Sequence, residues 1–234
     1  LLMKQKSEDI SESFKLFFMF AIPMTVGTVV LADSFLTILG KGEVAGELID
    51  YSVATPVLRL LAPAILALSI SQVLNSIIFG TEKFDLEAKI PLKNLIRSKI
   101  FVVFTLPYIK ALIVLPALYF GLLFFVAKHA VISALYVAQL MLIANVALMC
   151  ISIILVRKML TFVFPWKNLL KYVFSSAIMA LCFLLVEHPT RILTVLLYVI
   201  FGGIIYLAVL LIIDREARIL TRNILAEIKL TVKR

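Results

Sequence analysis

The chain has 234 residues, 63% of them hydrophobic, and a mean hydropathy of +1.11. Soluble globular domains are about 45 to 50% apolar, so this composition excludes an ordinary water-soluble domain. The net charge of +9 comes from short clusters of Lys and Arg between long apolar runs. Clusters in those places indicate membrane topology rather than a nucleic-acid-binding face.

Six stretches meet or approach the length of about 20 apolar residues that a membrane-spanning helix needs. They predict an all-α, polytopic membrane protein with one six-helix bundle over residues 14–213. A cytoplasmic segment at 1–13 precedes the bundle, and a basic tail at 214–234 follows it. Because the chain opens with Leu1 rather than Met, we expect a fragment of a longer protein. The predicted spans are residues 14–39, 53–79, 100–127, 130–156, 169–186 and 192–213.

The first two spans each carry one ionisable residue, and such residues in a bilayer cost about 2.5 to 3.5 kcal/mol. Asp33 lies six residues from the end of span one, and Arg59 six residues from the start of span two. Both are therefore about 9 Å deep on the same side, which predicts an ion pair. The alternatives are a structural clamp and an arginine that snorkels to the interface. The acidic connection between them, residues 40–51, is predicted to be a short interfacial helix.

Polar residues also follow helical spacing along the second half of span two. Ser69, Gln72 and Ser76 lie on one stripe, and Asn75 is three residues after Gln72. Such a stripe either lines an aqueous path or bonds neighbouring helices. The segment that follows, residues 81–99, mixes charged and apolar residues and is predicted to lie along the lipid headgroups.

Span three contains Pro107 and Pro116, which predict a kink because proline removes a backbone donor. Lys110 lies between them, near mid-depth, where it would face a cavity suited to an anionic headgroup. The alternative is a span that begins near Thr105, which would make Lys110 an anchor at the interface.

The remaining polar residues are predicted to be structural. Gln139 and Asn145 on span four are six residues apart and do not form one face, so we expect them to bond neighbouring helices. Cys150 and Cys182 lie inside apolar runs and are expected to be small core residues. His129 and His188 are isolated residues of external loops, where we expect them to be solvated.

The distribution of basic residues predicts the orientation. Of the 23 Lys and Arg, 18 lie on one side of the predicted membrane, when Lys15 and Lys171 are counted with the loops next to them. Three lie in the loops on the other side, and the last two, Arg59 and Lys110, lie within the spans. By the positive-inside rule, we expect both chain ends to lie in the cytoplasm. We expect the membrane itself to be the plasma membrane. The tail has Leu220, Ile224 and Ile228 at helical spacing, which predicts an amphipathic surface helix.

Enzyme motifs are missing from the sequence: it has no H-E-x-x-H, G-x-S-x-G, Walker A or dinucleotide-binding pattern. We therefore predict no catalytic residues, no metal site and no cofactor.

Four pieces of sequence carry a resemblance to a known family. They are LADSFLTILGK at 31–41, VLNSIIFGTEK at 73–83, WKNLLK at 166–171 leading into SSAIMA at 175–180, and DRE at 214–216. In this order, around six spans, they resemble the C-terminal half of lipid-linked oligosaccharide (polysaccharide) flippases of archaeal type. Those proteins belong to the multidrug/oligosaccharidyl-lipid/polysaccharide exporter superfamily.

The resemblance implies one lobe of a MATE-like, two-lobe transporter that flips a polyprenyl-phosphate-linked glycan by alternating access. The implied partners are that glycan, membrane lipids and a missing N-terminal lobe of the same or another chain; no nucleic acid is expected. Two other functions remain open: a lobe of a cation-coupled multidrug exporter, and a scaffold subunit that transports nothing. From this sequence itself, the candidates for the cavity are Arg59, Lys110, Gln72 and Asn75, with Asp33 as an ion-pair or coupling residue.

Overall fold

The computed structural model describes residues 2–44, 47–81, 99–125, 130–159, 166–185 and 191–219. Six helices in these ranges are long and apolar enough to cross a membrane. The protein is therefore an all-α, multi-pass membrane protein, apart from one short hairpin. Its chain divides into two compact units, unit 1 (residues 1–11 and 40–163) and unit 2 (residues 12–39 and 164–234), which are described in turn.

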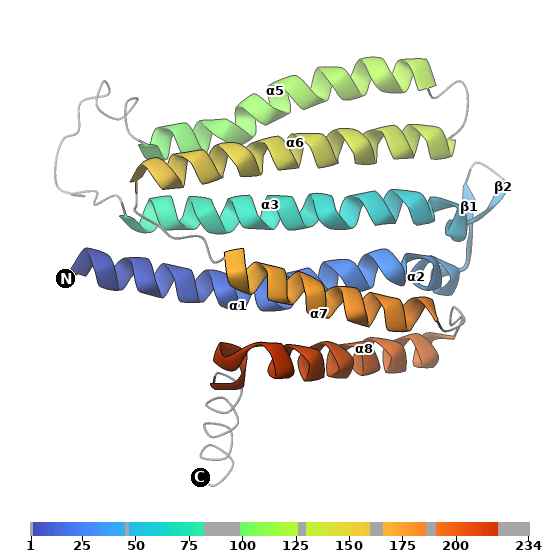
Figure 1. Cartoon of the computed structure of the whole chain (residues 1–234). Coiled ribbons are helices and arrows are strands. Elements are labelled where there is room, and N and C mark those ends of the chain that lie inside the picture. The colour runs from blue at the N-terminus through green and yellow to red at the C-terminus, as the bar shows by residue number, and fades with distance from the viewer. Residues whose placement is uncertain are drawn as a thin grey trace, which may run out of the picture. The chain divides into compact units, whose positions relative to one another are not determined.

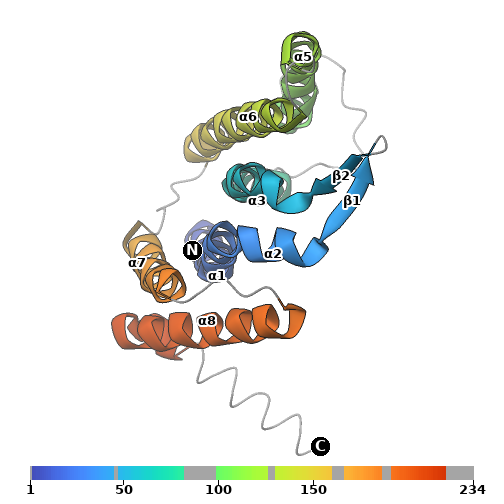
Figure 2. The same cartoon turned by 90° about the vertical axis from the view of Figure 1, so that its right-hand side faces the viewer.

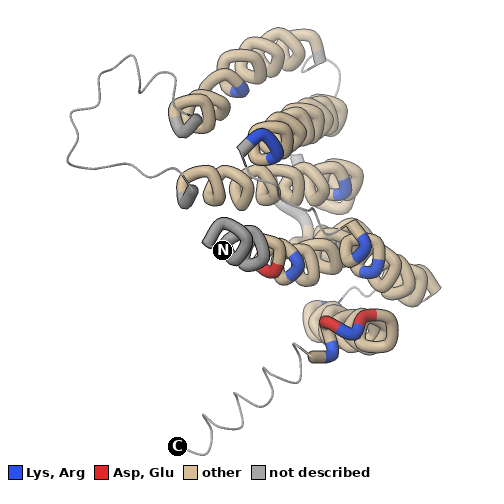
Figure 3. The backbone as a smooth tube through the Cα atoms, turned by 60° about the vertical axis from the view of Figure 1, so that its left-hand side comes forward, with Lys and Arg blue, Asp and Glu red and all other residues tan. Residues whose placement is uncertain are grey.

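Unit 1 is built around three long helices: α3 (Thr55–Thr81), α5 (Lys99–Phe125) and α6 (Ala130–Met159). Figures 1 and 2 show α6 between α3 and α5. In Figure 3 most of the length of each helix is free of charged residues. Helices that are apolar all round suit a lipid environment, and α5 exposes large side chains such as Tyr108, Leu112 and Phe120 along its length.

The connection before α3 is a hairpin rather than the predicted interfacial helix. Strands β1 (Lys41–Val44) and β2 (Glu47–Asp50) pair antiparallel, with Lys41 opposite Asp50, and the 3₁₀ helix η1 (Tyr51–Ala54) follows. Gly40 has a φ of 79°, a conformation that ends a helix and that glycine adopts without strain.

Unit 2 contains the later part of α1 (Leu2–Val30), with α2 (Ala32–Leu39), α7 (Trp166–Leu184) and α8 (Ile192–Ile213). Its core includes Phe14 and Phe18, which stack on one another. The buried Tyr206 hydroxyl of α8 donates to the Met19 carbonyl of α1 at 2.7 Å. This buried bond joins the two helices within unit 2.

Span one is shorter than predicted, because the helix breaks at Leu31 and α2 turns sharply away from α1 (Figure 2). The candidate span is Ile10–Val30. Asp33 consequently lies in the first turn of α2, outside the span. A carboxylate is favourable there, since the N-terminus of a helix carries partial positive charge.

The other five spans agree with the sequence prediction within a few residues: 51–79, 101–124, 131–158, 166–184 and 192–213. Both prolines lie inside α5, and Figure 1 shows the bend that they predict. Residues 215–219 are helical. The predicted segment at 82–98, the tail from 220 onward, His129 and His188 lie outside the described residues.

The cysteine prediction is wrong for Cys150, which is exposed, whereas Cys182 is half-buried. Helix α6 is apolar on all sides, so hydropathy does not tell its lipid-facing side from its packed side.

Candidate functional site

The most distinctive polar group of unit 1 is Lys110, near the middle of α5. Its Nζ donates a hydrogen bond of 2.5 Å to the side-chain oxygen Oδ1 of Asn145 on α6. Because α5 begins at Lys99, Lys110 is eleven residues into the helix. Lys110 therefore lies near the middle of α5 rather than at an end. The candidate span within this helix is Phe101–Phe124, and a span that begins near Thr105 stays an alternative prediction.

Asn145 connects Lys110 to a third helix. Its side chain is 5% exposed, and its Nδ2 donates to the Ala64 carbonyl of α3 at 3.0 Å. This bond fixes which end of the amide is the acceptor, so Oδ1 points to the lysine. We call Lys110, Asn145 and the Ala64 carbonyl the Lys110 cluster.

The chemistry of the Lys110 cluster follows from the neutrality of its partner. A carboxylate in place of Asn145 would cancel the ammonium charge, whereas the amide orients the ammonium and leaves a net charge of +1. An ammonium has three donors, and Asn145 accepts one of them. The cluster is therefore suited to attract an anion inside an apolar layer.

A second bond between α6 and α3 lies further along the same helices. The Ser152 hydroxyl donates to Oδ1 of Asn75 at 3.2 Å, and Ser152 itself is fully buried. Asn75 thus bonds a neighbouring helix, one of the two roles predicted for the polar stripe. Gln72 and Ser76 of the same stripe are exposed.

The structure brings only some of the predicted residues together. Arg59 is exposed on α3, five residues before Ala64 and therefore about 7.5 Å along the helix from the Lys110 cluster. Asp33 belongs to unit 2 and Arg59 to unit 1, so their ion pair stays a prediction. Asn145 bonds neighbouring helices as predicted, while Gln139 is exposed.

Sequence reasoning missed the importance of α6. Asn145 and Ser152 are seven residues apart, which puts them on one face two turns apart. Both bond α3. The seven-residue spacing of Asn145 and Ser152 could have indicated this shared face. It was missed because Asn145 was compared with Gln139, which lies on a different face of the helix.

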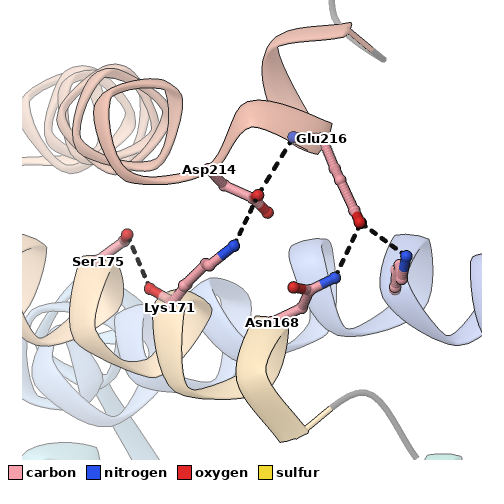
Figure 4. A network of polar contacts seen from close by, with 6 residues as sticks. Asn168, Lys171, Ser175, Asp214 and Glu216 are labelled. Atoms are coloured by element: carbon pink, nitrogen blue, oxygen red, sulfur yellow. Dashed lines mark hydrogen bonds and ion pairs between the residues drawn. The ribbon is translucent and has the colours of Figure 1, made fainter. Parts of the chain in front are cut away.

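Unit 2 holds a second polar group, which we call the Asp214 cluster: Lys15, Asn168, Lys171, Asp214 and Glu216. Figure 4 shows Asn168 and Lys171 of α7 facing Asp214 and Glu216. Asp214 is 1% exposed and follows directly after α8. Its Oδ1 accepts from Lys171 Nζ at 2.9 Å and from the Glu216 backbone N–H at 3.2 Å. The second bond is of the kind an N-cap residue makes, so Asp214 starts the helical turn of residues 215–219.

Glu216 extends the cluster to α1. Its Oε2 accepts from Lys15 Nζ at 2.6 Å and from Asn168 Nδ2 at 3.0 Å. The hydrogen bond from Lys15 is the main reason that the pKa of Glu216 lies below its ordinary value of 4.5, although partial burial opposes it. In this cluster each lysine has a carboxylate partner, so the charges compensate one another.

The sequence showed the pieces of the Asp214 cluster without their connection. Asn168, Lys171 and Ser175 are spaced by three and four residues, and Asp214 and Glu216 directly follow the last span. Lys15 is 201 residues from Glu216. Only the packing of α1 and α7 with the end of α8 reveals that they meet.

Among the described residues, no group of three or more His, Cys, Asp or Glu side chains is arranged to hold a metal ion. Comparisons with protein-family models, with curated proteins and with solved structures found no match to this chain.

Proposed function

We propose that this chain is the C-terminal half of a transporter of the cell membrane. The transporter moves a polyprenyl-phosphate-linked oligosaccharide from the inner to the outer leaflet by alternating access, and both ends of the chain lie in the cytoplasm. A second lobe, from the same or another chain, supplies the other wall of the cavity. Six spanning helices and the Lys110 cluster support this proposal.

The observation that carries the proposal is the neutral partner of Lys110. An ammonium at mid-helix is expensive in lipid, so it marks a functional site by default. Asn145 holds the ammonium in place without cancelling its charge. A phosphate that passes at this depth would meet a net positive charge in surroundings of low polarity, where Coulomb attraction is stronger than in water.

Arg59 and Gln72 are the next candidates for contact with the substrate. Both are exposed residues of α3, the helix whose Ala64 carbonyl belongs to the Lys110 cluster. Arginine suits phosphate because its fork of donors matches two oxygens at once. Arg59 would therefore bind the phosphate at a second level along the path, about 7.5 Å along α3 from Ala64.

A scaffold that transports nothing is the second candidate, and one observation favours it. Lys110, Asn145 and Ala64 join three helices, which is what a purely structural polar bridge does. The multidrug exporter has less support, because Asp33 lies outside the candidate span that ends at Val30.

Binding of a polyprenyl monophosphate, compared with the corresponding alcohol, tests the proposal. The protein is placed in nanodiscs of zwitterionic lipid, and the affinity for each probe is measured for the wild type and three variants. Asn145→Asp keeps an acceptor for Lys110 but cancels its charge, and Lys110→Met removes the charge. Lys158→Met is the control, since it removes an exposed cation at the end of α6.

Hydrogen bonds to charged groups contribute about 1.5 to 3 kcal/mol, which is roughly 10-fold to 150-fold in affinity. We expect both Asn145→Asp and Lys110→Met to weaken phosphate binding by about that much and to leave binding of the alcohol unchanged. Lys158→Met should bind both probes as the wild type does. If the folded Asn145→Asp variant keeps full affinity for the phosphate, the Lys110 cluster is a structural bridge and the scaffold reading replaces the transporter.

A further inference from the structure

A short helical turn follows α8 and forms one wall of a cavity at the end of unit 2. The turn comprises residues 215–219. The cavity has a volume of about 420 Å³, and its lining residues come from α1, α7 and the turn itself, among them Met19, Tyr172 and Ala217. Ala217 is 4% exposed. The turn therefore places one buried side chain against the cavity and covers it on that side.

One non-helical residue, Asp214, separates the turn from α8. The helix ends at Ile213, and Asp214 has an extended backbone with a φ of −113° and a ψ of 114°. A residue at the end of an element can absorb a change of its backbone angles and so move the segment that follows. The Asp214 side chain itself is held in place, because it is 1% exposed and its Oδ1 accepts from Lys171 at 2.9 Å. Asp214 is therefore suited to be a hinge that stays fixed to the helices.

Glu216 fastens the turn to the rest of unit 2 beyond this hinge, as Figure 4 shows. Its Oε2 accepts from Lys15 Nζ on α1 at 2.6 Å and from Asn168 Nδ2 on α7 at 3.0 Å. The Glu216 side chain is 58% exposed and that of Lys15 is 28% exposed. Ion pairs that water reaches contribute little to stability. The contact of Glu216 can therefore open while the helices stay packed.

We propose that residues 215–219 are a flap that swings on Asp214, and that Glu216 is the latch that holds the flap over the cavity. In the closed state, which the structure has, Glu216 bridges α1 and α7. In the open state Glu216 leaves Lys15 and Asn168, while Asp214 keeps Lys171. Asp214 directly follows the candidate span that ends at Ile213, so the flap opens at the edge of the membrane and admits water to the cavity.

The reactivity of a cysteine at position 217 tests the flap. Ala217→Cys is made in the whole chain after Cys150 and Cys182 have been replaced by alanine, and its rate of reaction with N-ethylmaleimide is measured in mild detergent. This rate reports how often the buried side of the turn meets water. We expect Lys15→Met and Glu216→Ala each to raise the rate about three-fold to five-fold, because both remove the ion pair. Rates that neither substitution changes would overturn the proposal.

Three controls separate a local flap from a general loosening of unit 2. Ile219→Cys on the same turn is at a position that is 63% exposed and should react fast in every variant. Met179→Cys, in the core of the unit at a position that is 3% exposed, should stay slow with and without Lys15→Met. Glu12→Gln removes an exposed charge that lines the same cavity and should not change the rate at Ala217→Cys. Equal acceleration at Met179→Cys and Ala217→Cys would refute a local flap.

Reversal of the charges tests the latch itself. Lys15→Glu or Glu216→Lys alone places like charges opposite one another and should speed up the reaction at Ala217→Cys. The double variant restores an ion pair of opposite polarity, and Asn168 can turn its amide to accept from the new lysine. Its rate should return toward that of the chain with neither reversal. If the double variant reacts as fast as either single variant, the contact of Lys15 with Glu216 is not a latch and the proposal fails.

Discussion

Replacement of Asn145 by leucine removes the centre of the Lys110 cluster and tests the geometry of unit 1. The side chain accepts from Lys110 on α5 and donates to the Ala64 carbonyl on α3. Leucine has a similar size but neither hydrogen-bonding group. The variant therefore leaves an ammonium at mid-helix without its acceptor.

The energetic cost of this loss differs between water and membrane. Hydrogen bonds to charged groups contribute about 1.5 to 3 kcal/mol in soluble proteins. Interhelical hydrogen bonds measured in a membrane protein average about 0.6 kcal/mol and reach about 1.7, because the unfolded chain also finds partners in the membrane. A bond to an ammonium belongs near the upper end of the membrane scale, so we expect Asn145→Leu to lower the free energy of unfolding by about 1 to 2 kcal/mol.

The assay is reversible unfolding in bicelles, followed as a double-mutant cycle with Lys110→Met. If the two residues interact as the structure has them, the coupling energy should be about 1 kcal/mol or more, since each single substitution strands the partner. Gln139→Leu on the same helix is the control, because Gln139 is exposed and should give a change near zero. Equal effects of Asn145→Leu and Gln139→Leu, or a coupling energy of zero, would refute the reasoning.

Three further predictions concern packing and charge. A Cβ at Gly121 would come within 2.2 Å of the Tyr136 ring, and the Tyr136 hydroxyl donates to the Ala117 carbonyl, which holds the ring in place. Gly121→Ala should therefore lower the free energy of unfolding by about 1 to 3 kcal/mol, measured by thermal unfolding. Tyr136→Phe removes the hydroxyl and should relieve part of that loss. Asp214→Ala should lower the free energy of unfolding more than Glu216→Ala does. The Asp214 side chain is 1% exposed and its loss leaves Lys171 without its carboxylate partner, whereas the Glu216 side chain is 58% exposed. Equal losses in chemical unfolding would contradict this. The pKa of Glu216 lies below 4.5 in the folded protein. The contribution of Glu216 to the free energy of unfolding is therefore complete above the pKa of the unfolded state and is lost as the pH falls through the pKa of the folded state. From pH 6 downward, the stability of Glu216→Gln should decline less steeply than that of the wild type.

The helical spans could be predicted from the sequence because hydropathy over about 20 residues records the thickness of the bilayer. The ends of spans depend on shorter signals. Span one was predicted to continue to Leu39, since residues 31–39 are nearly as apolar as the helix before them. The helix breaks at Leu31 and a new helix begins at Ala32, with Asp33 in its first turn, and a window average does not detect such a restart. The hairpin at Lys41–Asp50 was also missed, because the ten residues mix charged, glycine and apolar positions without a clear periodicity.

Partners across helices were beyond sequence reasoning, because they depend on which faces meet. Lys110 could be selected because it is a charged residue inside an apolar stretch, and the structure has it near the middle of α5. Its partner could not be selected, because Asn145 and Gln139 are equally plausible amides in an apolar helix. The rotation of α6 that faces Asn145 toward both α3 and α5 is set by packing over the whole helix.

Lysines of similar surroundings in the sequence acquire opposite electrostatic roles through the partners that the fold gives them. Lys171 pairs with the carboxylate of Asp214 and Lys15 with that of Glu216, so neither adds net charge to its surroundings. Lys110 pairs with an amide and keeps its charge. Whether a lysine keeps a net charge therefore depends on whether its partner is an amide, as at Asn145, or a carboxylate, as at Asp214. A phosphate within the membrane would be drawn to the lysine whose partner is neutral.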